Sequence, residues 1–185
     1  PLICDDTGAT IEAIVAYGAK LEEKNESLVV RGLRKPITPS EVINCRNSGS
    51  TLRFITPILA HTTGASTLTG GESLRRRPMK PLLSALKQLG VDCCSASEEG
   101  YAPIVVFGGG IKGGEASLPG DVSSQFISGL LFSSPLSDND VIVRLTSPLE
   151  SAPYVEMTLQ ILKKHGIRVE ASKDLKHYRV LGRQL

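Results

Sequence analysis

Three clusters of polar residues could bind a negatively charged, hydroxylated ligand. The first cluster is Val122-Ser123-Ser124-Gln125-Phe126, which Asp121 precedes as the predicted helix cap and an apolar run follows. A helix that begins there carries two hydroxyls and one amide in its first turn. Its free N–H groups and the positive end of its dipole suit an anion. The alternative interpretation is a serine-rich helix cap that binds nothing.

The second and third clusters combine glycine or proline with arginine. Asn47-Ser48-Gly49-Ser50-Thr51-Leu52-Arg53 is a small-residue turn that opens a predicted helix. Gly49 would let a ligand approach the backbone, and Arg53 lies one helical turn further on. Arg75-Arg76-Arg77-Pro78 places three guanidinium groups just before a helix with Pro78 in its first turn. Arginine binds carboxylate and phosphate, although a solvated basic loop is the alternative.

Other candidate motifs do not indicate chemistry. His61, His165 and His177 are scattered, without the spacing of a metal site or of a nucleophile and its base. Gly108–Gly113 formally matches the dinucleotide pattern G-x-G-x-x-G. Because residues 115–119 do not have the pattern of a helix, a pyrophosphate would lack the helix N-terminus that it needs. We therefore predict a glycine-rich turn between strands, and neither a metal nor a cofactor.

The composition is that of an ordinary globular chain. The sequence has 185 residues, 41% of them apolar and 22% charged, with a net charge of +2. This charge is too small to indicate nucleic-acid binding, and the sequence shows neither a membrane span nor a signal peptide. The four cysteines have no disulfide or zinc-site spacing, so we expect reduced thiols and a cytoplasmic location: Cys4, Cys45, Cys93 and Cys94.

The elements that position the polar clusters repeat three times along the chain. Each copy contains an amphipathic helix, a glycine at its end, a short strand, a polar turn and a second strand. The helices end at Gly18, Gly90 and Gly166. In the second and third copies a further helix and strand come first, at residues 50–59 with 66–69 and at 123–131 with 141–145. With one more strand in front, the predicted fold is α+β, built of βαβαββ units.

The first copy is incomplete, since only Leu2-Ile3-Cys4 precedes its helix and reads as a strand. We expect one domain over residues 1–185, with units at about 1–44, 45–119 and 120–185. We also expect that the native polypeptide begins upstream and that this chain is a fragment. The alternative is that the first unit has diverged.

Taken together, four blocks resemble the 5-enolpyruvylshikimate-3-phosphate synthase family: Asn47–Arg53, Thr69–Pro78, Val122–Phe126 and Leu149–Tyr154. The resemblance covers nearly the whole chain, and Val-Ser-Ser-Gln-Phe is its most specific block. It implies transfer of the enolpyruvyl group of phosphoenolpyruvate to the 5-hydroxyl of shikimate 3-phosphate, in aromatic amino-acid biosynthesis. It also implies a two-domain fold with helices inside and sheets outside, of which this chain is most of the N-terminal domain.

The resemblance assigns roles to matching positions of this sequence. Ser123, Ser124, Ser151 and Tyr154 would bind shikimate 3-phosphate, and Gln125 would contact both substrates. Gly49 and Arg77 would bind phosphoenolpyruvate. Asn47 and Arg53 match motif positions whose roles are less defined. All nine residues stand in this sequence at the motif positions.

The sequence departs from the family pattern in three ways. A Gly-Ser-Lys-Ser stretch that the family uses for both substrates is not present, and the second domain with the catalytic aspartate is also absent. Ser50 and Phe54 stand where many members have threonine and proline. We therefore expect this chain to bind shikimate 3-phosphate weakly as a monomer, to carry no catalytic residue and to be inactive without the second domain.

Three alternatives to this interpretation remain open. A related transferase acting on UDP-N-acetylglucosamine would lack the Ser-Ser-Gln block. A phosphate- or nucleic-acid-binding module could use Arg75–Arg77, although aromatic residues make up only 4% of the chain and offer few stacking platforms. A purely structural repeat domain would respond to no ligand.

Overall fold

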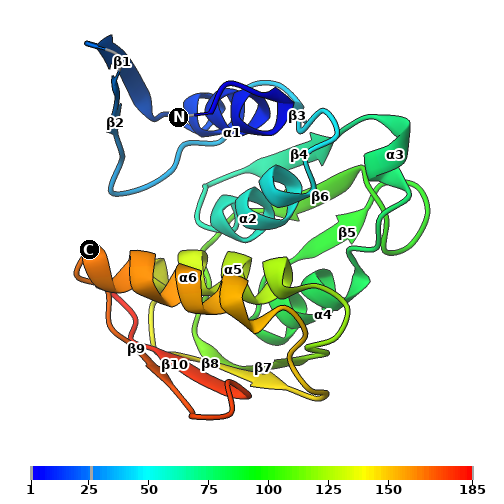
Figure 1. Ribbon diagram of the computed structural model, residues 1–185. Coiled ribbons are helices and arrows are strands. Elements are labelled where there is room, and N and C mark those ends of the chain that lie inside the picture. Colours follow the sequence, from blue (N-terminus) through cyan, green and yellow to red (C-terminus); the bar gives the residue numbers. More distant parts are fainter. Residues whose placement is uncertain (1, 26, 185) are drawn as a thin grey trace.

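The computed structural model describes residues 2–25 and 27–184 and contains three successive units (Figure 1). The first unit has α1 (Asp5–Ala16), β1 (Lys20–Lys24) and β2 (Ser27–Arg31). The second has β3 (Ile43–Asn44), α2 (Gly49–Leu59), β4 (Ala65–Thr69), α3 (Glu72–Arg75), α4 (Lys80–Gln88), β5 (Cys93–Ser95) and β6 (Ile104–Phe107). The third has β7 (Gly114–Leu118), α5 (Ser124–Ser133), the 3₁₀ helix η1 (Ser134–Leu136), β8 (Val141–Leu145), α6 (Ala152–Lys164), β9 (Val169–Ala171) and β10 (His177–Val180). Apart from α3 and η1, the second and third units have the predicted βαβαββ order.

The second and third units build sheets of the same topology. Their strand orders are β3-β4-β6-β5 and β7-β8-β10-β9. In each sheet the first two strands pair parallel and the other pairs are antiparallel. β1 and β2 form a separate antiparallel pair. Figure 1 shows α2, α5 and α6 side by side, with the two four-stranded sheets on the outside of the molecule.

Glycine ends the second helix of each unit, as predicted. Gly18, Gly90 and Gly166 follow the C-cap residues of α1, α4 and α6 and have φ angles of 111°, 81° and 80°. Side chains rarely adopt this left-handed backbone, whereas glycine does so without steric cost. The chain can therefore turn directly from each helix into the strand that follows.

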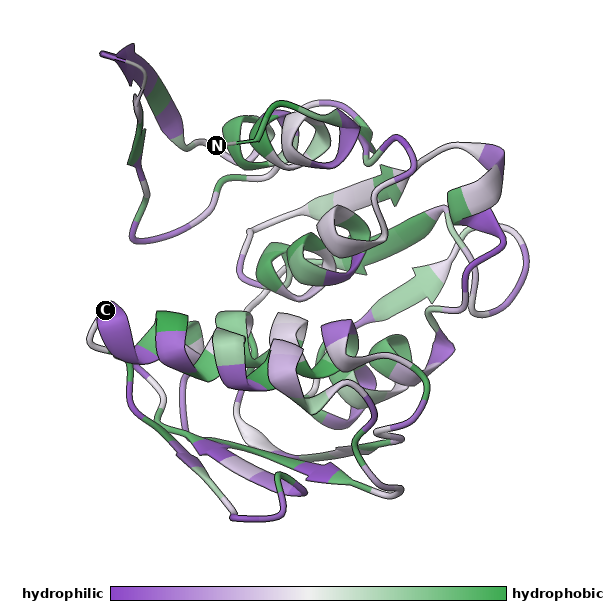
Figure 2. Cartoon of the chain, viewed as in Figure 1, coloured by the Kyte–Doolittle hydropathy of each residue, from purple (hydrophilic) through white to green (hydrophobic). Residues whose placement is uncertain are grey.

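α2 and α5 pack closely and run parallel to each other. A Cβ atom on Gly129 of α5 would lie 2.4 Å from the Arg53 carbonyl oxygen of α2. Four residues further along both helices, the Ser133 hydroxyl donates a hydrogen bond of 2.8 Å to the Pro57 carbonyl. Figure 2 shows hydrophobic residues along both helices. Since the helices are parallel, their N-termini lie at the same end of the molecule.

The start of α6 is tied to the start of α5 by a loop contact. Glu150 N–H donates to the Gly120 carbonyl oxygen at 3.1 Å, and Gly120 N–H donates to Ser147 Oγ at 2.9 Å. Eight residues further on, the hydroxyls of Ser128 and Thr158 are 2.8 Å apart. The equal steps along both helices mean that α6 is also parallel to α5, so three helix N-termini face one end of the molecule.

Three local predictions were wrong. Residues 2–4 form no strand, because Cys4 is the N-cap of α1 and shares a capping box with Thr7. Pro78 precedes α4, and Pro81 is the proline in its first turn. Asp121 does not cap α5, since Ser123 takes that position.

Candidate anion-binding site

The turn before α2 is held from both sides by backbone contacts. Ser48 is the N-cap of α2, and its hydroxyl accepts a hydrogen bond of 3.2 Å from Thr51 N–H. Gly71 N–H donates to the Arg46 carbonyl oxygen at 2.6 Å. The Asn47 side chain faces Gly71, whose Cβ position lies 2.5 Å from Asn47 Oδ1. Asn47 thus joins the turn to the segment that leads into α3.

Two guanidinium groups from different segments converge on Gly49, the first residue of α2. A Cβ atom placed on Gly49 would lie 2.9 Å from Arg53 Nη1 and 2.9 Å from Arg77 Nη1. The same point lies 3.7 Å from Gln125 Oε1 of α5. Real Cβ atoms do not approach other atoms this closely, so the absence of a side chain at Gly49 is what lets both guanidinium groups lie against the start of α2. An anion in front of Gly49 could then accept hydrogen bonds from both.

Arg53 is a buried cation with only part of its hydrogen-bonding capacity used. Its side chain is 9% exposed, and its guanidinium lies 5.2 Å from the centre of the Phe126 ring. Nη1 donates to Gln125 Oε1 at 2.7 Å, whereas Nε has no partner among the described residues. Burial, and then the neighbouring Arg77, lower the pKa of Arg53. Both effects disfavour the charged form, so an anion would stabilise this site.

Gln125 is held at both ends of its amide group. Its Oε1 accepts from Arg53, and its Nε2 donates to Ser50 Oγ at 2.8 Å. Both partners lie on α2, and because one donates and the other accepts, they fix the orientation of the amide against that helix. In the sequence, Ser50 stands out only as a departure from the family pattern. No local pattern could have revealed its contact, because Ser50 and Gln125 are 75 positions apart.

The predicted hydroxyls lie at the starts of α5 and α6. Ser123 caps α5 and accepts a bond of 3.3 Å from Gln125 N–H, and Ser124 is buried beside it. Ser151 is the N-cap of α6 in a left-handed conformation, with φ of 57°, and its hydroxyl makes no capping hydrogen bond within the described chain. Tyr154 is 61% exposed. Since the Gly120–Glu150 contact joins these two helix starts, Ser123, Ser124 and Ser151 belong to one end of the molecule.

The three consecutive arginines have separate positions. Arg76 pairs with Glu72 one turn earlier, and Arg77 extends towards Gly49. Arg75 is the last residue of α3, and Arg76 is its C-cap. Of the three, Arg77 is the one beside Gly49, so the case for an anion rests on Arg53 and Arg77.

Among residues 2–25 and 27–184, no three or more His, Cys, Asp or Glu side chains gather in a way that could hold a metal ion. In the same residues no helix has the length and apolar character needed to cross a membrane. The four cysteines are free thiols, with Cys45 and Cys93 buried.

Known proteins resemble the chain over nearly all of its length. The family model described as EPSP synthase (3-phosphoshikimate 1-carboxyvinyltransferase) matches residues 1–185. A 3-phosphoshikimate 1-carboxyvinyltransferase of Methanocorpusculum labreanum is 45% identical over 176 residues, which are 94% of this chain and 41% of the relative. Another, of Natronomonas pharaonis, is 48% identical over 171 residues, which are 92% of this chain and 39% of the relative.

A solved structure gives the same result for the fold. EPSP synthase from Acinetobacter baumannii superposes with a TM-score of 0.82 at 25% identity, covering 98% of this chain and 40% of that structure. The chain therefore spans about two fifths of the length of these relatives.

Proposed function

The chain belongs to the EPSP synthase family, and we propose that it supplies one half of a site for enolpyruvyl transfer. In this reaction the 5-hydroxyl of shikimate 3-phosphate attacks phosphoenolpyruvate, and phosphate leaves. The substrates are two anions that must lie side by side. The convergence of Arg53 and Arg77 on Gly49 is the observation that carries the proposal.

The position of phosphoenolpyruvate follows from the charges. Its phosphate and carboxylate need several donors, and the start of α2 offers Arg53, Arg77 and the backbone N–H groups around Gly49. Gln125 borders the same point through Oε1. We assign Gly49, Arg77 and Gln125 as phosphoenolpyruvate contacts. We give Arg53 two roles, as a cation at this site and as the group that orients Gln125.

The position of shikimate 3-phosphate follows from the hydroxyls. Ser123, Ser124 and Ser151 stand at two adjoining helix N-termini, where hydroxyls and N–H groups together suit a sugar-like phosphate. Tyr154 is exposed in the first turn of α6, within reach of the same ligand class. Gln125, between the two groups of residues, would then contact both substrates. Asn47 has a supporting role through its contact with Gly71.

This half of the site would bind and orient the substrates without completing the reaction. Transfer needs groups that give and take protons near neutral pH, and clamped anions from which water is excluded. The residues assigned here are arginines, serines, glutamine, tyrosine, asparagine and glycine. None of these side chains ordinarily titrates near pH 7. We therefore propose that the isolated chain is inactive and that a second domain, as in its longer relatives, supplies the acid–base groups.

The location, the oligomeric state and the binding partners of the chain are also part of what we propose. The free cysteines fit a reducing compartment such as the cytoplasm. We propose a monomer that binds small molecules and neither nucleic acid nor membrane. The single-domain organisation over residues 1–185 forms part of the same proposal. The units begin a few residues earlier than the expected starts at 45 and 120, because β3 (Ile43–Asn44) and β7 (Gly114–Leu118) are strands of the second and third sheets.

An NMR titration of the ¹⁵N-labelled chain tests the proposal. Shikimate 3-phosphate should shift the amide signals of Ser123, Ser124 and Ser151. Phosphoenolpyruvate, added next, should shift those of Gly49 and Gln125. Arg77→Ala should abolish the second response. Arg75→Ala removes the same charge from an exposed neighbouring side chain and should leave that response intact.

Two results would contradict the proposal. A folded chain with no shifts from either ligand would refute the assigned binding site. Equal losses in the Arg77 and Arg75 variants would mean that phosphoenolpyruvate responds to net charge and not to the geometry at Gly49.

A further inference from the structure

A chain of three hydroxyls connects the start of α2 to α1. Thr51 Oγ1 lies 2.8 Å from Ser48 Oγ and 2.7 Å from Thr10 Oγ1 of α1. Thr10 Oγ1 in turn donates to the Asp6 carbonyl oxygen at 2.9 Å. Thr51 is fully buried, and Ser48 is 2% exposed. Ser48 directly precedes Gly49, so the chain ends one residue from the proposed phosphoenolpyruvate site.

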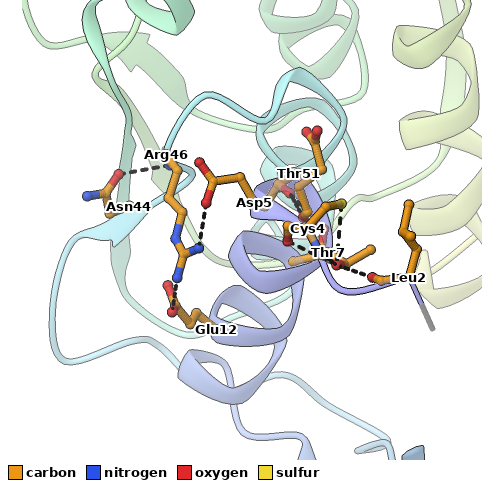
Figure 3. Close-up of polar contacts among 10 residues, drawn as sticks. Leu2, Cys4, Asp5, Thr7, Glu12, Asn44, Arg46 and Thr51 are labelled. Carbon is orange, nitrogen blue, oxygen red and sulfur yellow. Dashed lines mark hydrogen bonds and ion pairs between the residues drawn. The ribbon is translucent and has the colours of Figure 1, made fainter.

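A second polar contact joins the same turn to α1. Arg46 lies two residues before Ser48, and its guanidinium pairs with Asp5 at 3.1 Å and with Glu12 at 2.5 Å (Figure 3). Gly8 lies between these acids, and a Cβ atom there would lie 3.0 Å from Arg46 Nη1. The turn at residues 47–49 is thus bracketed by two attachments to one helix.

Apolar packing of α1 is limited. The buried residues of this helix are Ala9 and Ala13, and Ile14 packs half-buried against the core. Burial of these side chains gains less free energy than burial of the leucines that seat α2 or α4. Exposed ion pairs such as those of Arg46 are also worth little. The hydroxyl chain is the polar contact that ties α1 directly to the start of α2.

We propose that Thr51 and Thr10 are positioning residues of the phosphoenolpyruvate site. They touch no ligand. Their hydroxyls hold Ser48, and through it the backbone of Gly49, at the place where Arg53 and Arg77 converge. This inference rests on the proposed function, because it assigns these residues a role at the same site. It adds α1, which carries none of the assigned binding residues, to the elements that determine affinity for phosphoenolpyruvate.

Three variants and one control variant test the proposal by NMR titration of the chain with phosphoenolpyruvate and with shikimate 3-phosphate. Thr51→Val should raise the Kd for phosphoenolpyruvate about fivefold, the value of one lost hydrogen bond. The Kd for shikimate 3-phosphate should change less than about twofold, because the residues assigned to that ligand lie at the starts of α5 and α6. Thr51→Ser keeps the hydroxyl and should restore binding. Thr10→Val should reproduce the effect of Thr51→Val, at a half-buried position where folding tolerates it.

The matched control is Thr56→Val. Thr56 lies on the same helix and is fully buried, but within residues 2–25 and 27–184 its hydroxyl bonds only to the Leu52 carbonyl one turn earlier. This variant should change neither Kd. If both Thr51→Val and Thr10→Val bind phosphoenolpyruvate as the wild type does, while Arg77→Ala abolishes binding, the positioning role is wrong and the proposed function stands. Equal losses for both substrates would indicate a general structural defect and would also overturn the inference. If the wild-type chain gives no response to phosphoenolpyruvate at Gly49, the proposed function and this inference fall together.

Discussion

Replacement of Gly49 by alanine should separate binding of phosphoenolpyruvate from stability of the fold. The new methyl group would occupy the point that lies 2.9 Å from both Arg53 Nη1 and Arg77 Nη1. An anion that contacts both guanidinium groups gains two charge-assisted hydrogen bonds, each worth about 1.5–3 kcal/mol. The methyl group would push the guanidinium groups away from Gly49, and the loss of one of these bonds would weaken binding about 10- to 100-fold.

The same substitution should cost the fold little. Gly49 is the first residue of α2, where alanine is favoured over glycine by up to about 1 kcal/mol. Of the two groups that the methyl would approach, Arg77 is exposed and can move, whereas the buried Arg53 must shift its guanidinium. These effects oppose each other, so we expect a change in unfolding free energy below about 1 kcal/mol.

Isothermal titration calorimetry with phosphoenolpyruvate measures the affinity, and urea unfolding of the same samples measures the unfolding free energy. The control is Gly32→Ala, because a Cβ atom at Gly32 would meet nothing within 4 Å. This variant should bind as the wild type does. Wild-type affinity in Gly49→Ala would show that the ligand does not depend on the positions of Arg53 and Arg77 beside Gly49. A loss of shikimate 3-phosphate binding as large as the loss of phosphoenolpyruvate binding would also refute the reasoning.

Three further predictions concern stability and reactivity. Gly129→Ala should lower the unfolding free energy by about 2–3 kcal/mol in urea unfolding, because its methyl would lie 2.4 Å from the Arg53 carbonyl oxygen; unchanged stability would mean that α2 and α5 separate easily. Burial lowers the pKa of His61 to about 4, below the 6.5 of the unfolded chain, so the stability from its neutral ring is complete above pH 6.5 and declines towards pH 4. From pH 7 to pH 4.5, the free energy of unfolding measured in urea should fall by about 2–3 kcal/mol more in the wild type than in His61→Gln. A thiol reagent should rapidly label the exposed Cys4 and Cys94. Burial raises the pKa of Cys45 to about 12 and that of Cys93 to about 11, so rapid labelling of a third cysteine would contradict this prediction.

The unit order was predictable from the sequence because its signals are local. A glycine with positive φ ends α1, α4 and α6, and apolar spacing marks the helices that these glycines end. Helix caps were less predictable, because adjacent residues compete for one position. Asp121 and Ser123 are both residue types that cap helices well, and Ser123 is the one that caps α5. Just before them, Gly120 is hydrogen-bonded to the loop at residues 147–150, a tertiary contact that the local sequence does not show. At α4, Pro78 and Pro81 were both candidates for the proline of the first helical turn, and Pro81 takes that position.

The candidate site residues were predicted through family resemblance, and their partners were not predicted. Ser50 bonds to Gln125 across 75 positions, and Thr10 contacts Thr51 across 41. No short window of sequence contains both members of either pair. The side chain of Asn47 lies against Gly71, which the motif did not predict either. Such contacts depend on the tertiary fold, and a local motif does not reveal them.

The repeat explains why the assigned residues come from separate units. The second unit begins α2 and the third begins α5 and α6 at the same end of the molecule, because the contacts of α2 with α5 and of α5 with α6 show that these helices are parallel. Each helix N-terminus carries about half a positive charge. Parallel neighbours place these charges side by side, and the buried Arg53 adds a full charge that Arg77 already disfavours. These positive charges repel one another in the free chain, and an anion would relieve the repulsion. The proposed binding of two anionic substrates would therefore balance the charges that the packing of these three helices brings together.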